Sequence, residues 1–218
     1  MRPVMHPVVH LVPGTHAWNP KQLTGQWYHE GSLFRSILEA QGFRADVFAW
    51  STGLDGLLPW RRGHLWHATG IHLRNHIIPH RAPWARCPPL ETHVVTHSHG
   101  LQPTLVACAL GLYVHTLIDI CGPVRDDIIR EYGAAARKNI GHWLHVHSDD
   151  SDTMQWLGGI GDGALGITRP HPLADVNHFL PRAGHSKVLN EEAWLVLWDT
   201  WLDLIRKRDG HDDPDKAA

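Results

Sequence analysis

The sequence predicts an α/β fold, a three-layer α/β/α sandwich with a mostly parallel sheet of about six strands. Short apolar runs rich in β-branched residues alternate along the chain with segments of helical periodicity, and this alternation is typical of parallel strands joined by right-handed crossovers. Such a sheet is covered by helices on both faces. No internal repeat or domain boundary is visible in the 218 residues. We therefore expect one domain over residues 1–208 and a polar, disordered tail over residues 209–218.

The expected strands are short, apolar and followed by turn signals. They cover residues 7–12, 43–50, 92–97, 112–120, 143–147 and 175–180. The expected helices carry apolar residues at helical spacing. They cover residues 33–41, 60–78, 103–110 and 125–137, with a last helix from Asn190 to Arg208. Ser32 is the predicted N-cap of the first helix, and Gly42 and Gly111 are predicted helix stops.

Composition excludes several classes of protein. The formal net charge of −2 predicts no strong attraction to nucleic acid or anionic lipid. The sequence contains no run of about 18 apolar residues, so we expect no membrane-spanning helix. The first residues lack the apolar segment and cleavage site of a signal peptide. We therefore expect a cytoplasmic protein. Three cysteines, Cys87, Cys108 and Cys121, are expected to be buried thiols rather than a disulfide framework.

Histidine is abundant, with 20 copies in the chain. Most of these histidines fall in no ligand-like spacing, so we expect polar surface and sheet-edge positions rather than a zinc site. In the strand-like stretch that contains His142, His145 and His147, only the last two are expected to share a face.

The most informative segment is the T-H-S-H-G motif of residues 96–100. A β-branched apolar run precedes Ser98, and an apolar helix-like stretch follows with Pro103 in its expected first turn. A serine at a sharp strand-to-helix turn is the setting of an activated nucleophile, usually written G-x-S-x-G. Thr96 replaces the first glycine. The segment predicts that Ser98 is a catalytic nucleophile.

The same residues allow a second interpretation. T-H-S-H also matches the beginning of the metal-binding signature of metallo-β-lactamase-like hydrolases, in which further Asp and His ligands follow. Here the chain continues with Gly100, Leu101 and Gln102. The missing ligands disfavour a metal-dependent hydrolase.

A serine hydroxyl needs a base, and the base needs an orienting acid. Among serine hydrolases with this turn, the chain order is Ser, then Asp or Glu, then His. His185 follows the last expected strand in a Gly-containing loop and is preferred as the base over His178, which lies on that strand. Asp152 is the first choice for the acid, because Met154 could dock its loop. The neighbouring Asp150 and Asp149, and the more distant Asp119, stay open as alternatives.

The oxyanion hole of such a site is built from backbone N–H groups. One is expected from His99, directly after the nucleophile. The other is expected from Thr15, in the turn after the first strand, where Gly14 would permit the bend.

Together these segments resemble the α/β-hydrolase superfamily, in particular its small lipase- or esterase-like members. The resemblance rests on the strand and turn of residues 10–15, the elbow of residues 94–100 and the G-H-S of residues 184–186. It implies hydrolysis of a small-molecule carboxylic ester through an acyl-enzyme, with no large cap and no metal or organic cofactor. Pro13 and Thr96 depart from the family pattern. They favour the alternative of a catalytically silent binding domain of the same fold.

Overall fold

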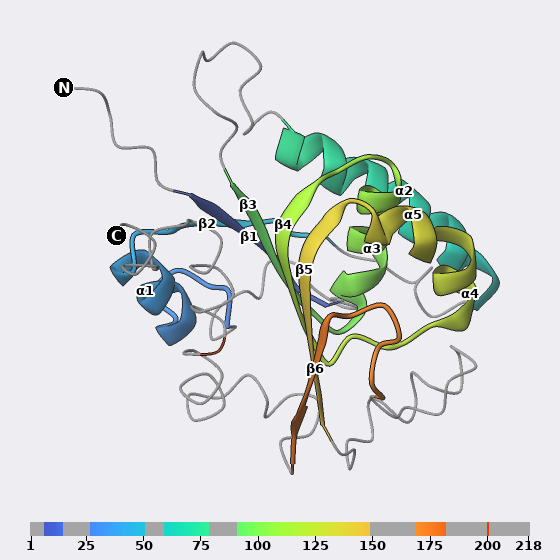
Figure 1. The fold of residues 1–218 in the computed structure, drawn as a ribbon. Helices are drawn as coiled ribbons and strands as arrows, with labels where there is room; N and C mark the ends of the chain where they lie inside the picture. Colours follow the sequence, from blue (N-terminus) through green and yellow to red (C-terminus); the bar gives the residue numbers. More distant parts are fainter. Residues whose placement is uncertain are drawn as a thin grey trace, which may run out of the picture.

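The computed structural model describes residues 7–14, 27–50, 59–78, 91–148, 169–181 and 200. Within them, six parallel strands form one sheet in the order β2-β1-β3-β4-β5-β6 (Figure 1). The strands are β1 (Val8–Val12), β2 (Arg44–Val47), β3 (Thr92–His97), β4 (Val114–Ile120), β5 (Ile140–Ser148) and β6 (Val176–Leu180). The chain moves from β1 outward to β2 and then returns to β3 on the other side of β1. In open α/β sheets, ligands bind at the carboxyl ends of the strands beside such a reversal.

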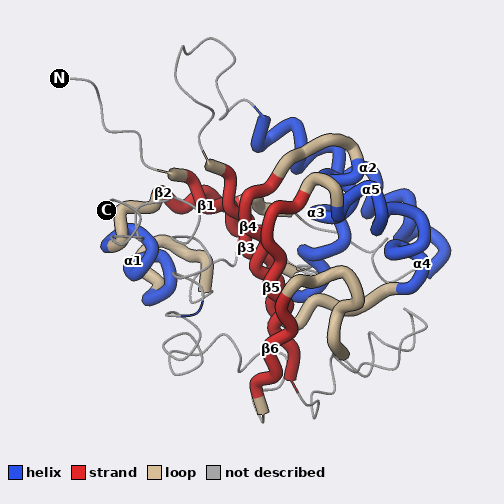
Figure 2. The backbone as a smooth tube through the Cα atoms, viewed as in Figure 1, coloured by secondary structure: helices blue, strands red, loops and turns tan. Residues whose placement is uncertain are grey.

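Helices cover both faces of this sheet, as the sequence predicts. In Figures 1 and 2, α1 lies on one side of the sheet and α2 to α5 lie on the other. The helical segments are α1 (Leu33–Ala40), α2 (Pro59–Ile77), the short 3₁₀ turn η3 (Ser98–Gly100), α3 (Leu101–Ala109), α4 (Asp126–Ile128), the π-helical turn η4 (Ile129–Gly133) and α5 (Ala134–Arg137). None of the helices in the described part of the chain is both long and apolar enough to cross a bilayer.

Alternation along the strands divides the core into two apolar clusters. Val9 and Leu11 of β1 face α1 and pack with its buried Phe34 and Leu38. Val12 faces the opposite side, where the second cluster joins α2 and α3 to the sheet. At the contact between those two helices, a Cβ on Gly70 would lie 2.6 Å from Val106. The glycine in the middle of α2 is therefore explained by close helix packing.

Helix ends follow the predicted signals. The Ser32 hydroxyl accepts a hydrogen bond from the Arg35 amide at 3.3 Å. Gly42 and Gly111 have φ of 84° and 93°, the left-handed conformation that terminates helices without a Cβ penalty. Pro103 lies in the first turn of α3.

Several predicted boundaries were wrong for identifiable reasons. The strand expected over 43–50 is shorter, because β2 lies at the sheet edge and its last bond to β1 comes from the Phe48 amide. β5 is longer than expected, because it pairs with β4 from Ile140 and with β6 as far as Ser148. The helix expected over 125–137 contains the π-helical turn η4. The last expected helix lies outside the described residues except for Thr200, which is helical.

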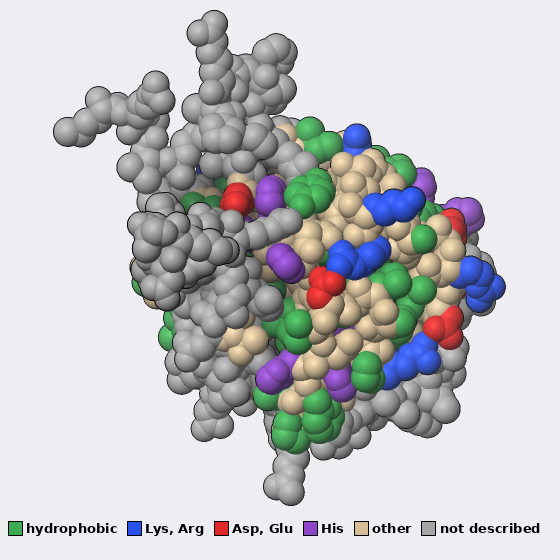
Figure 3. All heavy atoms as spheres, viewed as in Figure 1, with side chains coloured by type: hydrophobic (Ala, Val, Ile, Leu, Met, Phe, Trp, Pro, Cys, Tyr) green, Lys and Arg blue, Asp and Glu red, His purple; other side chains and the backbone are tan. Residues whose placement is uncertain are grey.

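The prediction that histidines lie at the surface was wrong for a subset that is buried: His10, His93, His145, His147 and His171. On β5, His142 is exposed, whereas the rings of His145 and His147 stack at 5.8 Å on one face, as alternation predicts. Cys108 and Cys121 are buried free thiols, as expected, and Cys87 lies outside the described residues. On the face shown in Figure 3, the described acidic and basic side chains are interspersed.

Candidate active site

The turn between β3 and α3 is strained at Ser98. β3 ends at His97, Ser98 has a φ of 55°, and the η3 turn leads directly into α3. Only two non-glycine residues in the described part of the chain, Ser98 and Cys121, have positive φ. A serine in this conformation costs conformational energy, and such strain is concentrated at functional sites. The backbone therefore has the geometry that the sequence motif predicts for a nucleophile elbow.

Two glycines allow the turn after β1 to pack against this elbow. A Cβ on Gly100 would lie 2.3 Å from the Val12 carbonyl oxygen, and a Cβ on Gly14 would lie 2.9 Å from the Ser98 Cβ. Neither position tolerates a larger residue without backbone movement. Gly14 was expected to permit a bend, but it does not adopt positive φ. What its missing side chain provides is room beside Ser98.

The turn after β1 is also held from the side of β2. The indole Nε1 of Trp50 donates a hydrogen bond of 2.7 Å to the Pro13 carbonyl oxygen. Trp50 packs edge-on against Trp66 of α2, with ring centroids 5.6 Å apart. Trp50, which follows β2, and Trp66 of α2 thus hold the backbone immediately before Thr15, which itself lies outside the described residues.

The two histidines that flank Ser98 contact aromatic rings from different clusters. His97 meets Trp27 at 6.5 Å between centroids, and Trp27 belongs to the cluster on the α1 side of the sheet. His99 stacks on Trp66 of α2 at 5.4 Å, on the opposite side. Their imidazoles therefore do not converge on one metal ion. This geometry disfavours the metal-hydrolase interpretation of the T-H-S-H segment.

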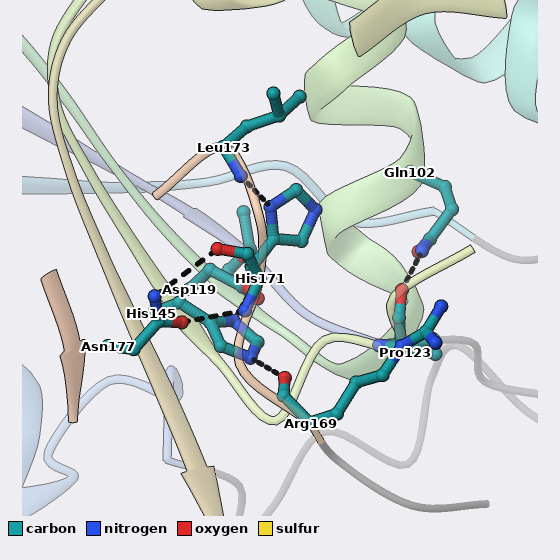
Figure 4. A network of polar contacts seen from close by, with 9 residues as sticks. Gln102, Asp119, Pro123, His145, Arg169, His171, Leu173 and Asn177 are labelled. Carbon is teal, nitrogen blue, oxygen red and sulfur yellow. Dashed lines mark hydrogen bonds and ion pairs between the residues drawn. The ribbon is translucent and has the colours of Figure 1, made fainter. Parts of the chain in front are cut away.

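A buried polar row crosses the sheet two residues before the elbow (Figure 4). Thr96, Asp119 and His145 are paired across β3, β4 and β5, and each is fully buried. The Thr96 hydroxyl donates to Asp119 Oδ1 at 3.0 Å, and Asp119 Oδ2 lies 2.5 Å from His145 Nδ1. Thr96 replaces the usual glycine. A glycine at this position would leave Asp119 Oδ1 without the hydrogen bond that the Thr96 hydroxyl donates. The substitution is thus compatible with the elbow.

The row continues beyond β5. His145 Nε2 bonds to the Arg169 carbonyl oxygen at 3.0 Å, and Asn177 of β6 bonds through its side chain to both backbone groups of His171. Burial, assisted by the nearby His145 and Arg169, lowers the pKa of His171 to about 3. This histidine is therefore neutral at physiological pH.

Asp119 is not available to orient a catalytic base. One of its oxygens bonds to Thr96 and the other to His145, and its side chain is fully buried. A Cβ on Gly122 would lie 2.3 Å from Asp119 Oδ1, so the chain after β4 closes directly over the carboxylate. Sequence reasoning missed this polar row; the signal was an acidic residue between the apolar Ile118 and Ile120 of β4.

The structure describes two of the five predicted site residues. Ser98 is at the elbow, 9% exposed, and His99 follows it with its backbone in the η3 turn. Thr15, Asp152 and His185 lie outside the described residues.

Among the alternatives, Asp149 and Asp150 also lie outside the described residues. His178 is on β6, where it is paired with Val146 of β5. Within the described part of the chain, no side chain hydrogen-bonds to the Ser98 hydroxyl.

No known family model and no curated protein matches the sequence. Among solved structures, TT1662 from Thermus thermophilus shares 13% identity, with 91% of this chain and 90% of that chain covered and a TM-score of 0.54. The lipase BlEst2 from Bacillus licheniformis shares 12% identity, with 90% and 92% covered and the same TM-score of 0.54. At this identity the similarity shows the fold, and it extends over almost the whole of both chains. The sheet order, the strained serine turn and these similarities establish that the chain has the α/β-hydrolase fold.

Proposed function

We propose that this protein is a serine hydrolase that cleaves carboxylic esters through an acyl-enzyme, with Ser98 as the nucleophile. The single observation that supports this proposal is the φ of 55° at Ser98, at the carboxyl edge of the sheet next to the topological reversal between β1 and β3. Packing of Gly14 and Gly100 holds the serine in that strained conformation. Strain of this kind presents a hydroxyl at the top of the sheet.

In the proposed reaction, His185 takes the proton from the Ser98 hydroxyl as its oxygen attacks the ester carbonyl. His185 then donates the proton to the leaving alcohol, and a water molecule hydrolyses the acyl-enzyme by the same route. Asp152 orients the imidazole, with Asp150 and Asp149 as alternatives.

Chain order supports these roles. β5 ends at Ser148, before the aspartates, and β6 ends at Leu180, before His185. Because the strands are parallel, both ends lie at the same edge of the sheet as Ser98. Asp119 is already engaged by its neighbours, which supports an acid from this later segment.

The oxyanion of the tetrahedral intermediate is proposed to accept hydrogen bonds from the backbone N–H groups of His99 and Thr15. The position of Gly14 beside Ser98 and the bond from Trp50 to Pro13 support this proposal for the turn after β1. Stacking on Trp66 fixes the side chain of His99, which leaves its backbone amide as the group that can act at the elbow.

Labelling with a fluorophosphonate probe tests the nucleophile. We expect the wild-type protein to be labelled at one site and Ser98→Ala not to be labelled. Ser36→Ala, at an exposed serine of α1, is the matched control and should be labelled like the wild type. A folded wild-type protein that resists the probe would contradict the assignment of Ser98.

Turnover of p-nitrophenyl esters of increasing acyl length tests the reaction and its substrate class. We expect hydrolysis that Ser98→Ala abolishes, and a loss of about a thousandfold or more in kcat for His185→Ala. Asp152→Asn should lower kcat more than Asp150→Asn. Absence of turnover above the Ser98→Ala background across the panel would favour the catalytically silent binding domain.

A further inference from the structure

A cluster of side chains that could bind a metal ion lies between β1, the edge strand β2 and the end of α2. His10 of β1 and Asp46 of β2 are paired neighbours, and His76 is in the last turn of α2. The His10 Nδ1 and the His76 Nε2 lie 2.7 and 2.8 Å from the same carboxylate oxygen, Oδ2 of Asp46. We call these three residues the edge cluster. Within the described residues, they are the one group of three or more such side chains whose ligand atoms all lie within 4.8 Å of one another.

We propose that the edge cluster is a binding site for a divalent transition-metal ion, with Zn²⁺ as the best match. Two imidazole nitrogens and one carboxylate oxygen form a donor set that suits Zn²⁺, whereas Mg²⁺ and Ca²⁺ prefer oxygen ligands only. Three elements far apart in the sequence supply the donors. This proposal does not depend on the function proposed for Ser98.

The cluster holds one carboxylate oxygen between two imidazoles. Burial alone would raise the pKa of Asp46, but the hydrogen bonds and charges of His10 and His76 outweigh it and hold that pKa well below its usual value. Asp46 is therefore ionised at neutral pH. A negative carboxylate requires no proton loss to bind a metal, whereas each imidazole binds through a deprotonated nitrogen, so protons on the two histidines compete with the ion.

The geometry needs only a small adjustment to hold an ion. Tetrahedral zinc, with ligand bonds of about 2.0–2.2 Å, separates its donor atoms by about 3.3 Å. Each imidazole nitrogen would therefore move about half an ångström away from Oδ2. Asp46 and His76 can provide this movement because both are partly exposed, while His10 stays buried on β1. A water molecule would be the fourth ligand of a tetrahedral ion.

A metal ion at this place would join α2 and the edge strand β2 to β1. Four residues after His10, the same β1 segment reaches Gly14, which packs against Ser98. The α2 helix also carries Trp66, which stacks on His99. A metal ion bound by the edge cluster is thus expected to stabilise the framework around the elbow without touching substrate.

Zinc titration of the full chain, followed by calorimetry and by thermal unfolding, tests the site. With 20 histidines in the chain, weak sites elsewhere will also bind zinc. The informative quantity is therefore the affinity of the one zinc ion per chain that binds tightly and requires the edge cluster. We expect His76→Ala and Asp46→Asn to weaken that affinity at least about a hundredfold. Each should also lose the zinc-dependent rise in Tm.

His72→Ala is the matched control, since His72 is exposed on the same helix one turn before His76. It should retain both the tight binding and the shift in Tm. A second measurement is the anomalous scattering of a zinc-soaked crystal at the zinc absorption edge, which should place a peak about 2.0–2.2 Å from the ligand atoms of His10, Asp46 and His76. If His76→Ala binds zinc as tightly as the wild type, or if the peak lies elsewhere, the proposal is overturned.

Discussion

Two aspartates in this sheet each lie next to histidines on neighbouring elements, yet the two clusters differ in how the carboxylate is used. In the inner cluster of Thr96, Asp119 and His145, each carboxylate oxygen has its own partner, and all three side chains are fully buried. In the edge cluster, two histidines share one oxygen of Asp46, and solvent reaches two of the three residues.

This difference separates a structural cluster from one that can bind a ligand. The inner cluster is saturated, because its hydrogen-bonding groups are matched within the sheet and no solvent reaches them. It supports the end of β3 just before Ser98. In the edge cluster, two imidazoles bond to one carboxylate oxygen, and Asp46 and His76 are partly exposed to solvent. The same residue types therefore serve different purposes according to their depth in the sheet.

The largest expected effect is loss of the inner carboxylate. Removing the carboxylate leaves the Thr96 hydroxyl and the His145 Nδ1 buried without a partner, and each unsatisfied buried group costs about 1–3 kcal/mol, so the two together cost about 2–6 kcal/mol. We expect Asp119→Ala to lower the free energy of unfolding by this amount in urea denaturation. The comparison of the two clusters would fail if Asp46→Ala were equally destabilising in the absence of metal.

A second prediction concerns the pH dependence of the region beside the inner cluster. In the unfolded chain, His171 binds a proton below a reference pKa of about 6.5, whereas the folded chain keeps it neutral down to a pKa of about 3. The unfolded state then binds more protons, so stability falls as the pH drops below 6.5. His171 should account for a loss of about 2 kcal/mol at pH 5 relative to pH 7.

The variant His171→Phe preserves an aromatic ring against Trp143, whose centroid lies 4.2 Å from that of His171. Urea denaturation at pH 7 and pH 5 should show a smaller difference for this variant than for the wild type. An equal difference in the two proteins would show that His171 does not titrate as its burial requires.

The contrast also explains what the sequence could predict. Strands, helices and the elbow depend on local patterns: the short buried run of β3, the first-turn position of Pro103 and the spacing of Ser98 and Gly100. The clusters depend on pairs distant in the chain. His145 lies 26 residues from Asp119, and His10 lies 36 residues from Asp46.

Only the strand order makes such pairs neighbours. For this reason, histidines that appeared to be surface residues are buried partners in the sheet. One signal was present, a charged or imidazole side chain within an apolar strand, as at Asp119 in β4 and His10 in β1. The sequence order of Ser98, Asp152 and His185 remains a prediction for the site itself.

A smaller effect is expected at Thr96. Thr96→Val preserves the shape of the side chain but leaves Asp119 Oδ1 without its donor, and an unsatisfied buried acceptor costs about 1–2 kcal/mol. Thr96→Ser retains the hydroxyl and should be closer to the wild type in urea denaturation. If both variants lose the same stability, the methyl group rather than the hydroxyl bond is what matters at this position.

The smallest effect is expected at the edge cluster without metal. Asp46→Asn removes the charge but leaves an amide oxygen that can accept a hydrogen bond from one histidine, and partly exposed ion pairs contribute at most about 1 kcal/mol. In a chelator-treated sample, the variant should therefore unfold within a few degrees of the wild type. Adding Zn²⁺ should then separate them, because a ligand that binds only the folded state raises its stability in proportion to the logarithm of its concentration. A gap that is large without metal and unchanged by zinc would mean that the edge cluster is a structural ion-pair network like the inner one.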